Sequence, residues 1–167
     1  MNTAAAVCLC VPAFVYAVFI RFSAVRRRRF FEHFQKFVYL FGVYSSATRA
    51  ESAEIILKTV KSEGYPGLSF AENACKMLRS GVDFESAWNR SVNENCPFLT
   101  ESDKSLVGGF VSAASASDPV TQERTMKIYN EEIENKLKKL AEYEKKDMRS
   151  KCAVVIFIGC AAALTVL

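Results

Sequence analysis

The sequence contains only one histidine, His33, and none of the short motifs on which most familiar enzymes depend. It has no phosphate-binding loop of the GxxxxGK type, no GxSxG nucleophile turn and no HExxH metal motif. A single histidine, close to Arg29, leaves almost no choice of general base for a nucleophile. The many acidic residues fall mostly on helix faces that we expect to be solvated. We therefore predict no catalytic site, no bound cofactor and no small-molecule substrate.

CxxC pairs are also absent, although the chain has six cysteines. Four of them lie in or beside two long uncharged runs, one near each end of the sequence: Cys8, Cys10, Cys152 and Cys160. The other two, Cys75 and Cys96, lie between these runs. A cytosolic location keeps such thiols reduced. We predict that both are small buried thiols and not zinc ligands, because closely spaced ligand pairs are missing.

The two uncharged runs extend from Ala4 to Ile20 and from Cys152 to Leu167. As helices they would be about 24 to 26 Å long, slightly less than the roughly 30 Å hydrocarbon core of a bilayer. We expect two short transmembrane helices, an N-terminal anchor at 1–21 and a C-terminal anchor at 151–167. A cleaved secretory signal is the alternative for the first run, although its basic residues follow the apolar stretch instead of preceding it. A buried core helix is the alternative for the second.

Basic residues flank both runs on the side that faces the middle of the chain. Because short loops rich in lysine and arginine stay in the cytoplasm, we expect a cytosolic middle region with both chain ends across the membrane. These side chains would also bind anionic lipid headgroups, at about 1 kcal/mol each, unless they only fix the orientation. The residues predicted at the membrane surface are Arg26, Arg27, Arg28 and Arg29, in the segment 22–29, and Lys145, Lys146, Arg149 and Lys151.

Between the basic flanks the chain is mildly acidic. The stretch from Phe30 to Glu144 carries 13 positive and 17 negative charges. A nucleic-acid-binding domain needs a basic face on its folded surface. Nucleic acid is therefore not an expected partner.

The region 30–150 shows helical and no strand periodicity, which predicts a cytosolic helical domain. Its first segment carries an aromatic stripe that we assign to the core of a bundle, with a cofactor-binding face as the alternative. Further helices are predicted over 50–62, 71–78 and 84–92, each ended by glycine or proline. Trp88, in the last of these, is assigned to the core, with a partner contact as the alternative. The stripe consists of Phe30, Phe34, Phe37, Phe41 and Tyr44.

Two more helices complete the domain. Thr100 and Asp103 form a variant of the capping box at the start of one, which continues past Gly108 and Gly109. Glycine inside a helix costs on the order of 1 kcal/mol, so the close approach of a neighbouring helix would explain the pair. The other helix begins at Asp118 as N-cap. Its apolar residues Met126, Ile133 and Leu140 recur every seven, which fits packing on its own domain or, alternatively, a coiled-coil partner. The fold class predicted is all-α, a compact bundle of about six helices flanked by two transmembrane helices.

Three segments resemble stage III sporulation protein AB, within an order of anchor, basic stretch, domain and anchor that covers the whole chain. The more specific marks are the Ala87-Trp88 pair after a glycine turn and the pattern formed by Ser117, Asp118 and Gln122. The segments are LRSGVDFESAWNRSV (78–92), TESDKSLVGGF (100–110) and SASDPVTQ (115–122).

The resemblance implies a component of the channel-like complex that mother cell and forespore build between them during endospore formation. Such proteins sit in the outer forespore membrane with the domain toward the mother-cell cytoplasm, and that domain is similar to the F-domain of type II secretion platform proteins. The expected partners are a cytosolic secretion-type ATPase, stage III sporulation protein AA, and other subunits of the complex. The missing phosphate-binding loop fits a chain that anchors or couples this motor and hydrolyses no nucleotide itself.

The polar corner at the start of the last helix is our candidate for the partner-binding surface, with Asp118, Gln122 and Arg124 as its residues. The alternative for Asp118 is a purely structural role as a helix cap. Two other functions stay open at this point: a platform or scaffold subunit of another secretion or pilus-like system, and an unrecognised membrane-bound enzyme.

Overall fold

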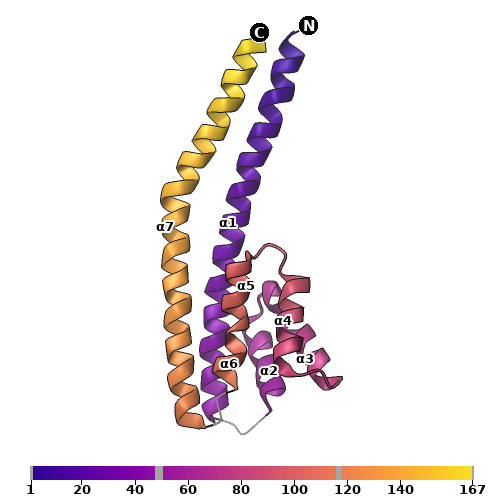
Figure 1. Ribbon diagram of the computed structural model, residues 1–167, viewed down its shortest axis with the longest axis vertical. Helices are drawn as coiled ribbons and strands as arrows, with labels where there is room; N and C mark the ends of the chain where they lie inside the picture. The colour runs from indigo at the N-terminus through magenta and orange to yellow at the C-terminus, as the bar shows by residue number, and fades with distance from the viewer. Residues whose placement is uncertain (1, 48–50, 116–117, 167) are drawn as a thin grey trace. The chain divides into compact units, whose positions relative to one another are not determined.

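The computed structural model describes residues 2–47, 51–115 and 118–166, and every regular element in these ranges is helical. The helices are α1 (Asn2–Ala47), α2 (Ser52–Glu63), the short 3-10 helix η1 (Pro66–Leu68), α3 (Ser69–Arg79), α4 (Phe84–Asn95), α5 (Glu101–Gly108), α6 (Phe110–Ala114) and α7 (Pro119–Val166). Figure 1 labels the α-helices and colours the chain by residue number from the N-terminus to the C-terminus. The all-α class predicted from the sequence is confirmed.

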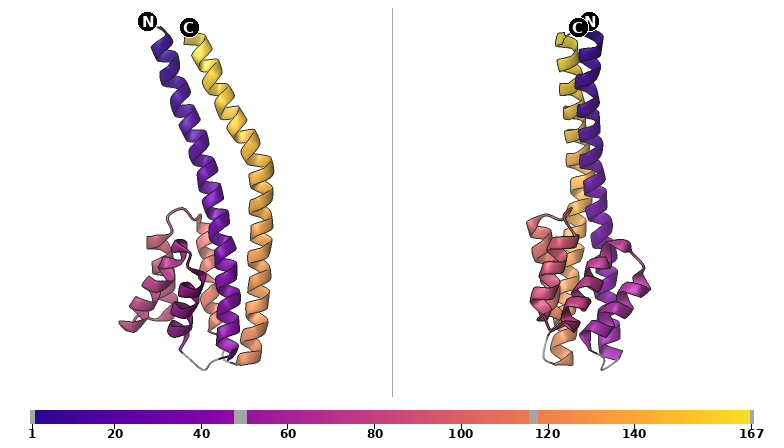
Figure 2. Two further views of the ribbon diagram at one scale, coloured as in Figure 1. Left: turned by 180° about the vertical axis from the view of Figure 1, so that it is seen from behind. Right: turned by 90° about the vertical axis from the view of Figure 1, so that its right-hand side faces the viewer.

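The chain divides into two compact units. The first, which we call the two-helix unit, comprises Met1–Arg28 and Lys138–Leu167, the outer parts of α1 and α7. These two helical segments lie side by side in both views of Figure 2, and Arg28 Nη1 lies 3.1 Å from Glu144 Oε2 between them. The second unit, which we call the helical domain, comprises Arg29–Leu137 and contains α2 to α6 together with the inner parts of α1 and α7.

The core of the helical domain is aromatic. The predicted stripe on α1 is confirmed for Phe30, Phe34, Phe37 and Phe41, all of which are fully buried. Tyr44, the last member of the predicted stripe, is half-buried, and Lys58 Nζ lies 4.5 Å from the centre of its ring. Each buried phenylalanine contributes about 1.5–3 kcal/mol through the apolar surface it removes from water. This burial outweighs the weak intrinsic helix propensity of aromatic residues and keeps α1 helical in this segment.

Three further aromatic residues, Phe70, Trp88 and Phe110, pack against the α1 stripe. Trp88 from α4 is fully buried, and its indole Nε1–H donates a 2.9 Å hydrogen bond to the carbonyl oxygen of Val107. Its ring lies 4.7 Å from that of Phe110 and 5.0 Å from that of Phe70, between centroids. The prediction of a core role for Trp88 is confirmed.

The helix ends have the local causes that the sequence indicates. Thr100 and Asp103 form the predicted capping box at α5, with both reciprocal hydrogen bonds present. Asp83 caps α4 by accepting a 2.9 Å hydrogen bond from the amide of Ser86. Gly64 and Gly81, just after α2 and α3, have φ values of 65° and 90°, in the left-handed region that favours glycine.

The predicted helix after Thr100 is divided in the structure. α5 ends at Gly108 and α6 begins at Phe110, so the expectation of one continuous helix here is wrong. The cause is the glycine pair, since two successive residues without Cβ atoms hold the helical backbone weakly. The expected close approach is confirmed, because a Cβ atom on Gly108 would lie 2.6 Å from Oδ1 of Asn89 on α4. If α5 and α6 are counted as one helix, the described residues form six α-helices, the number that the sequence predicts.

The two predicted transmembrane anchors, 1–21 and 151–167, gain no support from the structure. In the part of the chain that it describes, no helix combines the length and the apolar character needed to cross a bilayer. Most side chains of the two uncharged runs lie outside the described residues. The backbone of residues 4–20 and 152–166 is helical, within α1 and α7.

Replacing Gly64 by alanine is expected to lower the free energy of unfolding by about 1–2 kcal/mol, because an L-residue is strained at positive φ. Gly42 is a matched control, since it lies inside α1 and a Cβ atom there would meet nothing within 4 Å. Gly42→Ala should raise the stability by up to about 1 kcal/mol. Urea unfolding followed by the fluorescence of Trp88, the only tryptophan in the chain, measures both. Equal shifts of the same sign would contradict this explanation.

Candidate functional site

The three residues predicted to bind a partner lie at the N-terminal end of α7, and the structure gives each a different environment. Asp118 precedes the helix and its Oδ1 accepts a 2.9 Å hydrogen bond from the amide of Thr121. Hydrogen bonds from Thr121 hold the pKa of the Asp118 carboxyl below its ordinary value. Asp118 is therefore a helix cap, as its alternative interpretation proposed, although its carboxylate is also exposed to solvent.

Gln122 connects three helices of the domain. Its Nε2 donates a 2.7 Å hydrogen bond to the carbonyl of Ala114 at the end of α6. Its Oε1 accepts a 3.0 Å hydrogen bond from Ser45 Oγ near the end of α1. Both polar atoms of the amide are thus engaged within the domain, and Gln122 positions the corner that Asp118 begins. Ser117, the other polar residue of the motif, lies outside the described residues.

Arg124 differs from both neighbours because it is exposed and has no carboxylate partner in the described part of the chain. Gln122 uses both of its polar atoms within the domain, whereas the guanidinium of Arg124 is exposed to solvent. The sequence pattern alone did not separate these roles. The difference depends on contacts of Gln122 with Ala114 on α6 and with Ser45, which is 77 positions away in the chain.

Gln122→Ala is expected to lower the free energy of unfolding by about 1–3 kcal/mol, because it removes two hydrogen bonds that join helices. Arg124→Ala should change it by no more than about 0.5 kcal/mol, as is usual for an exposed side chain. Thermal unfolding of the two variants, monitored through Trp88, tests the contrast. A loss at Arg124 as large as that at Gln122 would show that Arg124 also stabilises the corner.

The predicted membrane-surface residues are described only in part. Arg26 and Arg29 are exposed and Arg27 and Arg28 are half-exposed on α1. Arg28 pairs with Glu144 on α7, within the two-helix unit. The side chains of Lys145, Lys146, Arg149 and Lys151 lie outside the described residues.

The single histidine belongs to a contact between α1 and the end of α2. His33 Nδ1 is paired with Glu63 Oε1, and Lys36 Nζ lies 3.9 Å from the same carboxylate oxygen. The imidazole stacks on the ring of Tyr65, with centroids 4.1 Å apart and an interplanar angle of 7°. That ring in turn covers Gly67, where an added Cβ atom would collide with it. These contacts fix the turn after α2 to α1, a role that the sequence did not indicate.

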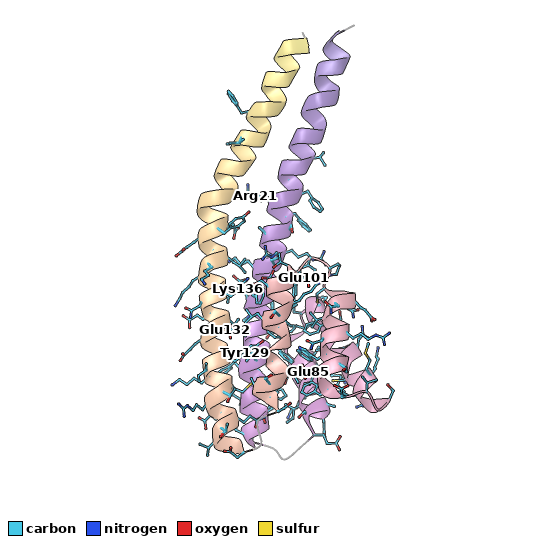
Figure 3. The ribbon with its side chains drawn as sticks, in the orientation of Figure 1. Arg21, Glu85, Glu101, Tyr129, Glu132 and Lys136 are labelled. Atoms are coloured by element: carbon cyan, nitrogen blue, oxygen red, sulfur yellow. The ribbon has the colours of Figure 1, made fainter. Side chains whose placement is uncertain are left out.

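A buried charge pair joins α5 to α7. Asp103 is fully buried, and its Oδ1 lies 2.6 Å from Nζ of Lys136. The Lys136 ammonium also lies 5.9 Å from the centre of the Phe31 ring. Close by, the hydroxyl of Tyr129 donates a 2.6 Å hydrogen bond to the carbonyl of Leu106, and burial raises the pKa of that hydroxyl well above its ordinary value. Figure 3 shows Tyr129 and Lys136 projecting from α7.

The two cysteines of the domain, Cys75 and Cys96, are buried, as predicted, and neither forms a disulfide within the described residues. Burial raises the pKa of the Cys75 thiol to about 11, so the thiol is protonated at neutral pH. Across the described residues, no group of three or more histidine, cysteine, aspartate or glutamate side chains is placed to hold a metal ion.

Together these features define an all-α bundle protein. Several of its polar contacts join one helix to another, as those of Gln122, His33 and Asp103 do. At the predicted partner corner Arg124 is exposed and makes no ion pair within the described residues. A model of the family described as stage III sporulation protein AB matches residues 3–167, and the chain belongs to this family. Comparisons with curated proteins and with solved structures found no match. Family membership gives the chain a role related to sporulation.

Proposed function

We propose that this protein is a non-enzymatic membrane component of the channel complex formed between mother cell and forespore. In this proposal the helical domain holds a cytosolic secretion-type ATPase, stage III sporulation protein AA, to the membrane machinery. The observation that carries the proposal is the family match over residues 3–167. The resemblance to the F-domain of secretion platform proteins belongs to the proposal, and the all-α bundle is compatible with it.

Membrane attachment through the two ends of the chain is part of the same proposal. Its support is the absence of charged residues from Ala4 to Ile20 and from Cys152 to Leu167. On α1, Phe19 and Phe22 expose 67% and 66% of their surface, and on α7 Phe157 exposes 76%. Large apolar side chains this exposed to water indicate an interaction surface, which lipid would cover. The helical domain would then face the mother-cell cytoplasm, with the basic residues near Arg28 at the headgroups.

Carbonate extraction of membranes from sporulating cells tests the attachment. We expect the chain to stay in the membrane pellet, as integral proteins do. Release into the supernatant would contradict membrane attachment through the two anchors. It would not contradict the role in sporulation.

Co-flotation tests the coupling to the motor. Purified ATPase is mixed with liposomes that contain the full chain, and the liposomes are floated through a density gradient. We expect the ATPase to float with these liposomes and to stay at the bottom with empty liposomes of the same lipid composition. An ATPase that floats with neither would contradict the proposed coupling.

The alternative of a platform subunit in another secretion or pilus-like system is tested by expression. We expect the protein to appear only in sporulating cells. Equal amounts in vegetative cells would favour the alternative.

A further inference from the structure

The exposed large apolar side chains of the helical domain are few, and two of the most exposed lie at the start of α7. Val120 exposes 77% of its surface and Ile128 exposes 58%. On the opposite side of the same helix, Met126, Tyr129 and Ile133 are buried in the core. The inner face of α7 therefore packs in the core of the domain, whereas Val120 and Ile128 are apolar side chains that do not contribute to this core.

Arg124 lies between these two residues on the same helix face. Positions 120, 124 and 128 are separated by four residues each, a spacing that places them in one row along an α-helix. We call this row of Val120, Arg124 and Ile128 the outer ridge. An aliphatic side chain flanks the guanidinium on each side of the ridge.

No acidic side chain of α7 is spaced so that it could neutralise the charge of Arg124. Residues three and four positions away are helical neighbours, and for Arg124 these are Val120, Thr121, Lys127 and Ile128, none of which is acidic. Within the described residues no carboxylate pairs with Arg124.

Two other exposed basic residues of α7, Lys127 and Lys139, are placed differently. Lys127 has Glu123 and Glu131 four residues away, and Lys139 has Glu142 three residues away. Both therefore have acidic neighbours on their own helix face. The outer ridge thus combines a positive charge that lacks a counter-charge with exposed aliphatic surface.

We propose that the outer ridge is the surface that docks the ATPase, an inference that rests on the proposed function. The ATPase would contribute a carboxylate to Arg124, flanked by apolar side chains that cover Val120 and Ile128. An arginine presents a fixed fork of donors that matches a carboxylate, and arginine is enriched among the residues that dominate protein interfaces. The aliphatic neighbours exclude water from the ion pair and contribute apolar burial of their own.

The neighbouring charges favour a protein partner over an anionic lipid surface. Glu123, Glu131 and Glu132 are exposed on the same helix. They would repel a continuous layer of phosphate groups, whereas a protein surface can present one carboxylate to Arg124 and avoid the acidic residues.

The test measures binding of the purified ATPase to the full chain in detergent micelles. Two variants alter the outer ridge: Arg124→Glu reverses its charge, and the double change Val120→Ser and Ile128→Ser removes its apolar surface. Each is expected to weaken binding about tenfold or more, as loss of a dominant interface residue does. Lys139→Glu is the matched control, because it reverses an exposed charge on the same helix outside the ridge, and should change binding less than about twofold. The fluorescence of Trp88 verifies that every variant is folded.

The outcomes separate the two proposals. Weaker binding by both ridge variants with a normal control supports the docking surface. Normal binding by both ridge variants would overturn the docking surface and leave the coupling to the ATPase intact. Absence of binding by the unchanged chain would overturn the proposed function, and the docking surface with it.

Discussion

Replacement of Phe110 by alanine is expected to lower the free energy of unfolding by about 3–5 kcal/mol, the range for deleting a large aromatic side chain from a core. Phe110 is fully buried at the start of α6. Its ring lies 5.3 Å from Phe37 and 5.0 Å from Phe41, between centroids, in addition to its contact with Trp88. The residue therefore holds α6 against α1 and α4 at once, and its truncation would leave a cavity where these three helices meet.

Tyr39→Ala is the control for this prediction, because Tyr39 is an aromatic residue of α1 that exposes 63% of its surface. Its removal should cost less than about 0.5 kcal/mol, as for most exposed positions. Chemical denaturation of the two variants, followed through Trp88 fluorescence and circular dichroism, gives the comparison. Similar losses at the two positions would show that Phe110 is not central to the core.

Replacement of Lys136 by methionine is also expected to cost about 3–5 kcal/mol, because it leaves the buried carboxylate of Asp103 without its counter-charge. Asp103 cannot reach water, since it is fully buried. It also accepts a 3.0 Å hydrogen bond from the amide of Thr100, which fixes it at the start of α5. Changing Asp103 to asparagine in the same chain should recover part of the loss, because the amide keeps an acceptor for Thr100 and carries no charge.

Lys104 is a closely matched control for Lys136. Its Nζ lies 2.8 Å from Glu101, and the two lysine side chains are equally exposed, at 20%. The difference lies in the acid, since Glu101 is 88% exposed. Lys104→Met should therefore cost no more than about 1 kcal/mol, the usual value of a surface ion pair. A loss at Lys136 no larger than at Lys104 would contradict the importance that we assign to the buried pair.

Much of the fold could be predicted from local patterns. The aromatic stripe of α1, the capping box of Thr100 and Asp103, and the glycine and proline breaks between helices all depend on residues within a few positions of one another. Such signals act through helical spacing and backbone conformation, which the sequence displays directly. The expectation of one continuous helix after Thr100 was wrong, because Gly108 and Gly109 weaken the helix there. Asn89 on α4 approaches the chain at the same point.

The contacts that fix the helices relative to one another could not be predicted in the same way. Asp103 and Lys136 are 33 positions apart, and His33 and Glu63 are 30 apart. Their pairing depends on how the helices pack, and a single sequence gives no direct information about this. The candidate site shows the same limit. The sequence pattern named the residues at the start of α7, but only the contacts of Gln122 with Ser45 and Ala114 show that this side chain maintains the corner.

The most direct test of the proposed function is a binding measurement between the purified full chain and the sporulation ATPase, with and without nucleotide. We predict saturable binding at a fixed stoichiometry, because an adaptor must hold the motor at a defined site. A full chain whose buried Trp88 shows that the domain is folded, but which fails to bind the ATPase in either nucleotide state, would contradict the proposed coupling.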